Sequence, residues 1–208
     1  MEIIYRAFDG KEFNDEDKCK LHEDNLFYEE MMPALLKFVD SKDENNRYEE
    51  EMQEILKIVD YKDEFFFYMD WADFAYRIGR KYKKSDKYQE SINAHKSSIK
   101  LLQKAIELDA KNPISYNKLG KNYLYLEEYQ DAIYNFEKAI EYNYKDLIRC
   151  YYCLAECKSA TNEYQEAINY FQKVIELDSS GTSKDLGYGA MSELGISVCK
   201  GNLSKNTK

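Results

Sequence analysis

The clearest pattern of apolar and polar positions lies between Pro113 and Asp146. Its apolar residues recur with helical spacing, which predicts two amphipathic helices over about 116–126 and 129–142. Two small residues, Gly120 and Ala132, stand among the large apolar ones of these helices. Because small residues allow two helix backbones to approach closely, we expect the two helices to pack against each other as a hairpin.

The same pattern recurs downstream and upstream. A second copy contains Tyr151-x-x-Leu154-Ala155 and then Tyr164, Ala167 and Phe171, with Lys158 in the place of Tyr123. An upstream copy contains Ile78-Gly79-x-x-Tyr82, then Tyr88, Ser91 and Ala105, with about seven residues inserted before Ala105. Seven residues make about two helical turns, so the insertion can lengthen the helix without rotating its apolar face.

A fourth copy begins at Met191-x-x-Leu194-Gly195-x-x-Val198, and no second helix follows it before Lys208. We therefore predict three repeats, over about 72–112, 113–146 and 148–181, and a terminal helix over 188–200. Such a helix either caps the stack or marks a truncated longer protein.

This pattern resembles the tetratricopeptide repeat, in which an aromatic-x-x-Leu-Gly-x-x-Tyr helix is followed by an Ala-x-x-x-Phe helix over about 34 residues. The resemblance implies a mainly α protein, an α-solenoid of helix pairs. It also implies a scaffold for protein–protein interaction. The composition agrees with a helical chain, since a third of the residues are charged and only two are proline.

The chain before the repeats has a different pattern. A β-hairpin of Glu2–Phe8 against Lys11–Phe13 is expected around Asp9-Gly10, followed by extra N-terminal helices. Those helices are expected over about 15–24, 25–39 and 47–59, and one long aromatic helix over 62–84 leads into the first repeat. We assign 1–61 to an acidic N-terminal segment and 62–208 to the solenoid.

Charge divides the chain in the same way. The net charge of the whole chain is −9, but residues 1–70 carry −12 and residues 71–208 carry +3. The acidic total argues against nucleic-acid binding. The sequence shows neither a signal peptide nor a membrane span, and the odd number of five cysteines fits reduced thiols, so we expect a cytoplasmic protein.

Candidate chemistry does not support an enzyme, a metal site or a cofactor. The chain has two histidines, of which His95 lies in the inserted part of a helix, and it lacks phosphate-loop and nucleophile-elbow motifs. Cys19 and His22 are close together, but no cysteine pair precedes them to complete a zinc finger. The run Cys150-x-x-Cys153-x-x-x-Cys157 places three thiols on one helix face, which we interpret as core packing.

The resemblance implies that the first helix of each repeat lines a concave groove for partner peptides. The matching positions are Asp73, Tyr76, Arg80, Lys83, Lys84, Ile114, Asn117, Lys121, Leu124, Tyr125, Arg149, Tyr152, Glu156, Ser159 and Ala160. Five cations against two acids predict an extended acidic protein segment as the ligand. The candidate binding residues are Tyr76, Arg80, Lys84, Asn117, Lys121, Tyr125, Arg149 and Tyr152.

Three other interpretations remain open. Exposed helix positions favour Lys and Arg without any ligand. The acidic N-terminal half could instead block a basic surface on a nuclease or toxin, as an inhibitor or immunity-type protein would. It could also fold back over the groove as a lid. The carboxylate clamp of some relatives is not expected, because among its positions only Arg149 carries the cation expected there.

Overall fold

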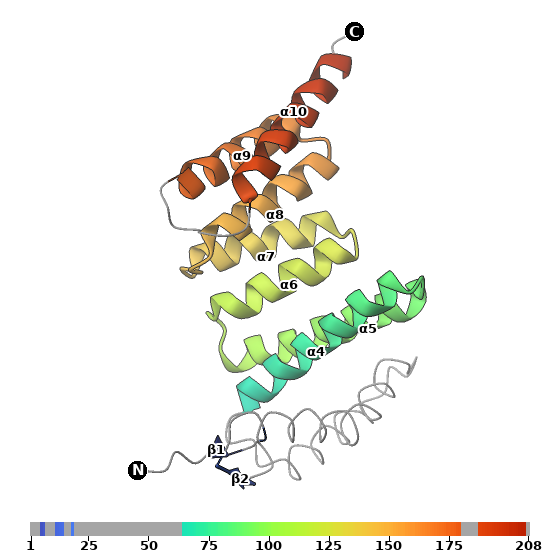
Figure 1. Ribbon diagram of the computed structural model, residues 1–208, viewed down its shortest axis with the longest axis vertical. Helices are drawn as coiled ribbons and strands as arrows, with labels where there is room; N and C mark the ends of the chain where they lie inside the picture. The colour runs from blue at the N-terminus through green and yellow to red at the C-terminus, as the bar shows by residue number, and fades with distance from the viewer. Residues whose placement is uncertain (1–4, 7–10, 15–17, 19–63, 180–186, 207–208) are drawn as a thin grey trace. The chain divides into compact units, whose positions relative to one another are not determined.

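The computed structural model describes residues 5–6, 11–14, 18, 64–179 and 187–206. These residues are mainly helical, as predicted (Figure 1). The helices are α4 (Glu64–Lys84), α5 (Tyr88–Leu108), α6 (Pro113–Tyr125), α7 (Tyr129–Glu141), α8 (Leu147–Ala160), α9 (Tyr164–Ser179) and α10 (Tyr188–Asn206). The chain forms two compact units, Met1–Leu108 (unit 1) and Asp109–Lys208 (unit 2).

In unit 1, two short strands and one helix pair are described. Strand β1 (Tyr5–Arg6) pairs antiparallel with β2 (Glu12–Phe13), with Tyr5 opposite Phe13. These strands lie within the predicted hairpin and are shorter than it. The predicted helices 15–24, 25–39 and 47–59, the pair Cys19 and His22, and the predicted boundary at residue 61 lie outside the described residues.

The bounds of α4 confirm the long helix predicted over 62–84. This helix packs against α5. Trp71 and Phe67 of α4 are buried, and the centres of their rings lie 5.3 Å apart. Two buried serines of α5 face α4, where Ser98 donates to the carbonyl of Ala72 at 2.7 Å. Small polar side chains that are satisfied in this way allow the helices to pack closely.

His95 has a different place from the one expected. It is buried at the centre of the pair, and a Cβ atom added to Gly79 would lie 2.7 Å from its Nε2 atom. It therefore occupies the position equivalent to Phe136 of the second repeat, and it does not belong to the insertion. The insertion follows it and lengthens α5, which has 21 residues against 13 in α7.

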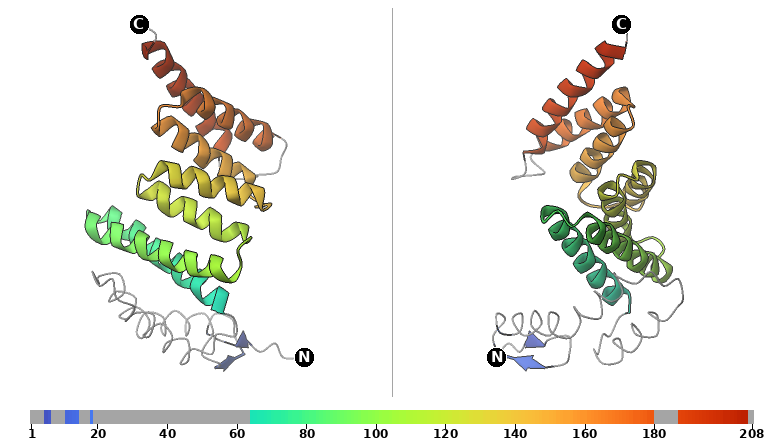
Figure 2. Two further views of the ribbon diagram at one scale, coloured as in Figure 1. Left: turned by 180° about the vertical axis from the view of Figure 1, so that it is seen from behind. Right: turned by 90° about the vertical axis from the view of Figure 1, so that its right-hand side faces the viewer.

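In unit 2, the pairs α6–α7 and α8–α9 pack in succession and α10 packs on α9 (Figure 2). The close approach expected at Gly120 is confirmed. A Cβ atom at Gly120 would lie 2.8 Å from the ring of Phe136, which is completely buried with Ala132. The α-solenoid arrangement of helix pairs is thus built on contacts between a small residue and an aromatic ring.

The turns between paired helices are equivalent in all three repeats. Asp86, Glu127 and Asn162 each lie two residues before the second helix, with positive φ angles of 57°, 62° and 65°. In each turn the next backbone amide donates to a carbonyl five residues earlier, as in Glu128 to Tyr123 at 2.9 Å. This geometry ends a helix with a left-handed residue and satisfies its last carbonyls.

Lys158 of the third repeat takes the place of Tyr123 in the second repeat. Its ammonium group lies 2.6 Å from Glu163 and 2.9 Å from Glu166, and only 13% of its side chain is exposed. The hydrogen bonds to these two carboxylates raise the pKa of Lys158. Ion pairs of Lys158 with Glu163 in the turn and Glu166 in α9 therefore occupy the place that Tyr123 has in the second repeat.

The start of α6 provides a direct test of the local structure. The Asn112 side chain accepts hydrogen bonds from the amides of Ile114 at 3.1 Å and Ser115 at 3.2 Å, and Pro113 occupies the first turn. Asn112→Ala should lower the free energy of unfolding by about 1 kcal/mol in urea titrations, because two helix amides lose their acceptor. Asn112→Ser retains an acceptor and should lose clearly less. Equal losses in the two variants would contradict this role.

No helix among the described residues is both long and apolar enough to span a membrane.

Candidate functional site

The predicted site residues on α4 belong to unit 1. Tyr76 is half-buried, with its ring edge-on to His95 at 5.4 Å. Arg80 is exposed and its guanidinium lies 5.9 Å from the centre of the Tyr76 ring. Lys84 is the exposed last residue of the helix. The structure thus brings Tyr76 and Arg80 together on one face of α4.

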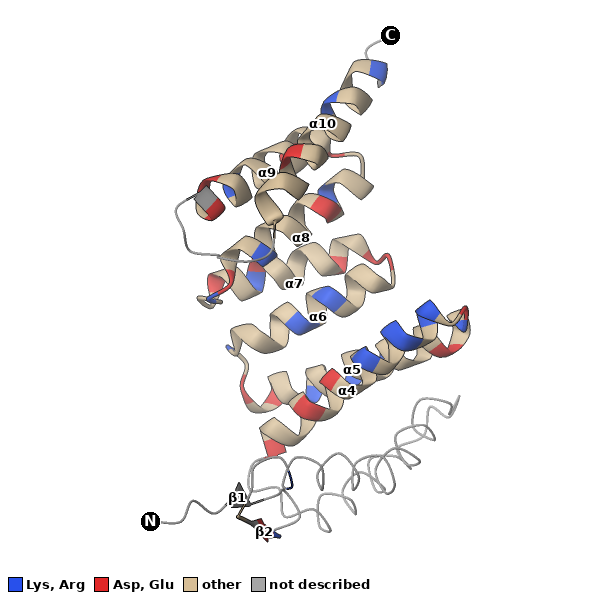
Figure 3. Cartoon of the chain, in the orientation of Figure 1, with Lys and Arg blue, Asp and Glu red and all other residues tan. Residues whose placement is uncertain are grey.

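The other predicted residues lie in unit 2, on the first helices α6 and α8. Helix α6 contributes Asn117, Lys121 and Tyr125, and α8 contributes Arg149 and Tyr152. Basic residues are visible on both helices (Figure 3). Helices α6 and α8 contact each other.

Asn117 does not lie at the surface. It is 1% exposed, and its Nδ2 atom donates to the sulfur of Cys150 at 3.2 Å. The side chain therefore joins α6 to α8 inside the core, where a partner could not reach it. The position of Asn117 in the motif predicted the direction of its side chain but not how deeply the side chain is buried.

Lys121 is half-buried and lies close to Arg149. Burial is the largest cause that lowers the pKa of Lys121, and the positive charge of Arg149 lowers it further. The thiols of Cys153 and Cys150 and the carboxylate of Asp146 act in the opposite direction and do not compensate fully. In the described part of the chain, Lys121 forms no ion pair. Lys121 and Arg149 therefore form a partly buried pair of positive charges that the neighbouring acidic groups do not fully balance.

Arg149 is held by neighbours that the motif did not identify. Its Nε atom lies 3.3 Å from Asp146 and donates to the Tyr188 hydroxyl at 3.3 Å. Burial acts to lower the pKa of Arg149, but the contacts with Tyr188 and Asp146 raise it overall. The terminal nitrogens take part in no hydrogen bond within the described chain. The guanidinium is thus fixed at one edge and open at the other.

Tyr152 is positioned by aromatic neighbours. Its ring centre lies 5.1 Å from that of Tyr188 and 5.8 Å from that of Phe171. Its hydroxyl is hydrogen-bonded to Glu156. Burial and the nearby negative charge of Glu156 raise the pKa of Tyr152 to about 12. Tyr152 therefore remains neutral and offers a flat surface beside Arg149.

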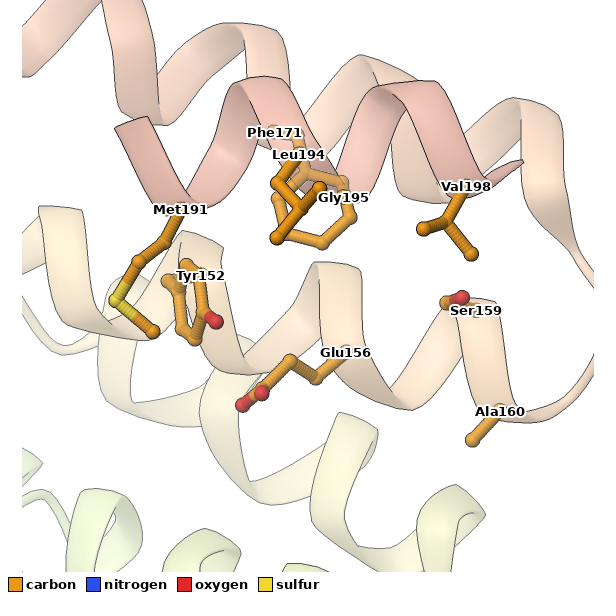
Figure 4. A pocket seen from close by; sticks show the side chains of 9 residues that line it. All are labelled: Tyr152, Glu156, Ser159, Ala160, Phe171, Met191, Leu194, Gly195 and Val198. Atoms are coloured by element: carbon orange, nitrogen blue, oxygen red, sulfur yellow. The ribbon is translucent and has the colours of Figure 1, made fainter. Parts of the chain in front are cut away.

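Beyond Tyr152 there is a hollow between α8 and α10, with a volume of about 440 Å³ (Figure 4). Sequence reasoning placed four of its residues, all on α8, in the groove: Tyr152, Glu156, Ser159 and Ala160. It missed the part of the lining formed by Phe171 and by Met191, Leu194, Gly195 and Val198 of α10. Met191, Leu194 and Val198, which belong to the start of the fourth copy, are exposed.

The cysteine run packs in the core, as we interpreted it. Cys150, Cys153 and Cys157 are buried with Leu154 in the cluster between α7 and α8. Burial raises the pKa of Cys150 to about 11 and that of Cys157 to about 12. No group of potential metal ligands is found among the described residues.

Comparisons with known proteins bear on the repeats. Residues 127–189, less than a third of the chain, match a family model described as Regulator of microtubule dynamics protein 1-3. No curated protein matches the sequence significantly.

Solved structures with a similar arrangement include the first TPR of Spaghetti (RPAP3) bound to HSP90 peptide SRMEEVD, at 18% identity and a TM-score of 0.48. That match covers 65% of this chain and 94% of the other. The Sgt2 TPR domain from Aspergillus fumigatus is similar at 17% identity and a TM-score of 0.47, over 65% of this chain and 81% of the other. The first TPR domain of human RPAP3 gives 17% identity and a TM-score of 0.45, over 63% and 96%.

Proposed function

We propose that this chain, a tetratricopeptide-repeat protein, is a protein–protein interaction scaffold whose groove in unit 2 binds an extended acidic segment of another protein. The observation that carries the proposal is the pair Lys121 and Arg149. Both stand at predicted groove positions, and burial, followed by repulsion from Arg149, lowers the pKa of Lys121. A carboxylate from a ligand would remove that repulsion.

The geometry around the pair fits a peptide carboxylate. Arg149 is oriented through its Nε atom by Asp146 and Tyr188, so its terminal nitrogens can bind a carboxylate with two parallel hydrogen bonds. Tyr152 lies beside it and Tyr125 lies at the end of the same α6 face as Lys121. These rings offer apolar contacts between charges. The proposed role needs no catalytic group.

The unit 1 residues Tyr76, Arg80 and Lys84 remain a prediction, and the proposal for unit 2 does not depend on them. The alternative role, an inhibitor or immunity-type protein acting through its acidic N-terminal half, concerns residues outside the described part. The two roles differ in the charge of the ligand. A basic ligand is expected for the acidic half and an acidic ligand for the groove.

Lys121→Glu tests the proposal. The introduced carboxylate would lie beside Arg149 and occupy the place of the ligand's acid, so the fold should be retained. Binding of a fluorescein-labelled hexaglutamate peptide, measured by anisotropy, should weaken about 10- to 100-fold, since charge-assisted hydrogen bonds are worth about 1.5–3 kcal/mol. The same reversal at the exposed Lys200, which lies on α10, is the matched control and should change the affinity little.

Unchanged affinity in Lys121→Glu would reject the groove proposal. Binding of a hexalysine peptide with equal affinity to both proteins would then support the acidic N-terminal half as the binding surface.

A further inference from the structure

Helix α10 has apolar residues on two sides. One side packs on α9, where Ser192 and Cys199 are buried and a Cβ atom at Gly195 would lie 2.5 Å from the ring of Phe171. The other side carries Met191, Leu194 and Val198, which are 49%, 68% and 53% exposed. A helix that is apolar on two sides is normally covered on both. The second side of α10 is therefore a surface that should bind another element.

The equivalent side of the other first helices shows what such an element is. Leu119 and Leu154 hold the motif position of Leu194, and they are 5% and 0% exposed. Leu154 is covered by Ala132 and Phe136 of α7, the second helix of the preceding repeat. For α10, no second helix covers this side within residues 64–179 and 187–206. The missing element thus corresponds to the second helix of a repeat.

The lining of the hollow between α8 and α10 indicates which charge a binding partner should carry. Met191, Leu194 and Val198 point across it toward Tyr152, Glu156 and Ser159 of α8 (Figure 4). Glu156 is the charged residue of the lining. Burial raises the pKa of Glu156 and the hydrogen bond from Tyr152 offsets this only in part, so a nearby cation would stabilise the carboxylate.

We propose that the hollow between α8 and α10 binds an amphipathic helix of a partner protein, with large apolar side chains along one face and a Lys or Arg beside them. The apolar face covers Met191, Leu194 and Val198, and the cation reaches Glu156. This site adjoins the acidic-segment groove and shares Tyr152 with it, but it requires the opposite charge and does not involve Lys121.

A second copy of this chain would fit less well. Between Met191 and Val198 the charged residue of α10 is Glu193, so an identical helix seated in the hollow would bring a second acid near Glu156. Like charges in a partly buried contact oppose association. Charge complementarity therefore favours a different protein over self-association.

A designed peptide tests this proposal with the full chain. The probe is a labelled helical peptide of alanine and glutamine, with three leucines at the spacing of Met191, Leu194 and Val198 and one lysine beside the middle leucine. A second peptide has glutamate in place of that lysine. The lysine peptide should bind about tenfold more tightly, and Glu156→Lys should reverse the order of the two peptides.

Two further variants separate the site from its surroundings. Leu194→Asp should weaken the lysine peptide at least about tenfold without unfolding the protein, because Leu194 is largely exposed. Ser197→Asp, exposed on the same helix but outside the lining, should have no effect. Binding of the lysine peptide and binding of the hexaglutamate peptide are measured separately, so this site and the acidic-segment groove can fail independently.

The proposal is overturned if the two peptides bind equally, or if Leu194→Asp binds as tightly as the unchanged protein. It is also overturned if sedimentation shows a dimer that Leu194→Asp dissociates, since a second copy would then occupy the hollow.

Discussion

Phe136→Ala is expected to lower the free energy of unfolding by about 3–5 kcal/mol, the usual cost of removing a large buried aromatic side chain. Phe136 is completely buried between α6 and α7, and its ring contacts the backbone at Gly120. The cavity cannot close easily, because Cys153 and Leu154 of α8 pack in the same cluster. Urea unfolding followed by circular dichroism measures the change.

A double-mutant cycle with Gly120 shows whether this contact determines the residue type. In the unchanged protein, Gly120→Ala should cost about 1–3 kcal/mol, because its Cβ atom would lie 2.8 Å from the Phe136 ring. In the Phe136→Ala background the same change should stabilise by up to about 1 kcal/mol, since alanine favours a helix over glycine. A loss of equal size in both backgrounds would contradict the contact as the reason for glycine.

The fold of the repeats could be predicted because each contact depends on residues at fixed spacing. Gly120 and Phe136 are recognisable in the sequence, and so is the length of the insertion that extends α5. The place of His95 was missed, although Ser91-x-x-x-His95 has the same spacing as Ala132-x-x-x-Phe136. An imidazole ring fills the position of a phenyl ring, and a search for hydrophobic residues does not detect it.

The candidate site was less predictable, because motif positions give the direction of a side chain but not what surrounds it. Asn117 was expected in the groove, and its hydrogen bond to Cys150 instead places it in the core. Arg149 is oriented by Tyr188, which lies 39 residues later in the chain. The exposure of Leu194 depends on how α10 packs against α9, and no local pattern specifies that packing.

The buried thiols give the protein a dependence on alkaline pH. The pKa of Cys150 is raised from 9.0 to about 11 and that of Cys157 from 9.0 to about 12, with burial as the largest cause for both. The folded state therefore holds these protons more tightly than the unfolded state. The resulting stability is fully present below pH 9, the pKa of the unfolded thiols, and is progressively lost as the pH rises from there through the folded values.

Raising the pH from about 8 to about 10 should therefore remove about 1.4 kcal/mol of unfolding free energy for each of these two thiols, one pKa unit being worth about 1.36 kcal/mol. In Cys157→Ala the loss between the two pH values should be smaller by about that amount. Tyrosines with raised pKa values, such as Tyr152, contribute equally to both proteins, so they cancel in the comparison.

Ile168→Ala is the matched control for the Cys157 experiment, because it removes a buried side chain without removing a thiol. It should lower the free energy of unfolding by the same amount at both pH values, since neither isoleucine nor alanine titrates. Urea titrations of the three proteins at each pH provide the comparison. If Cys157→Ala loses as much stability as the unchanged protein on going to the higher pH, the thiol at this position is not protected by burial, and the core packing assigned to the cysteine run is wrong there.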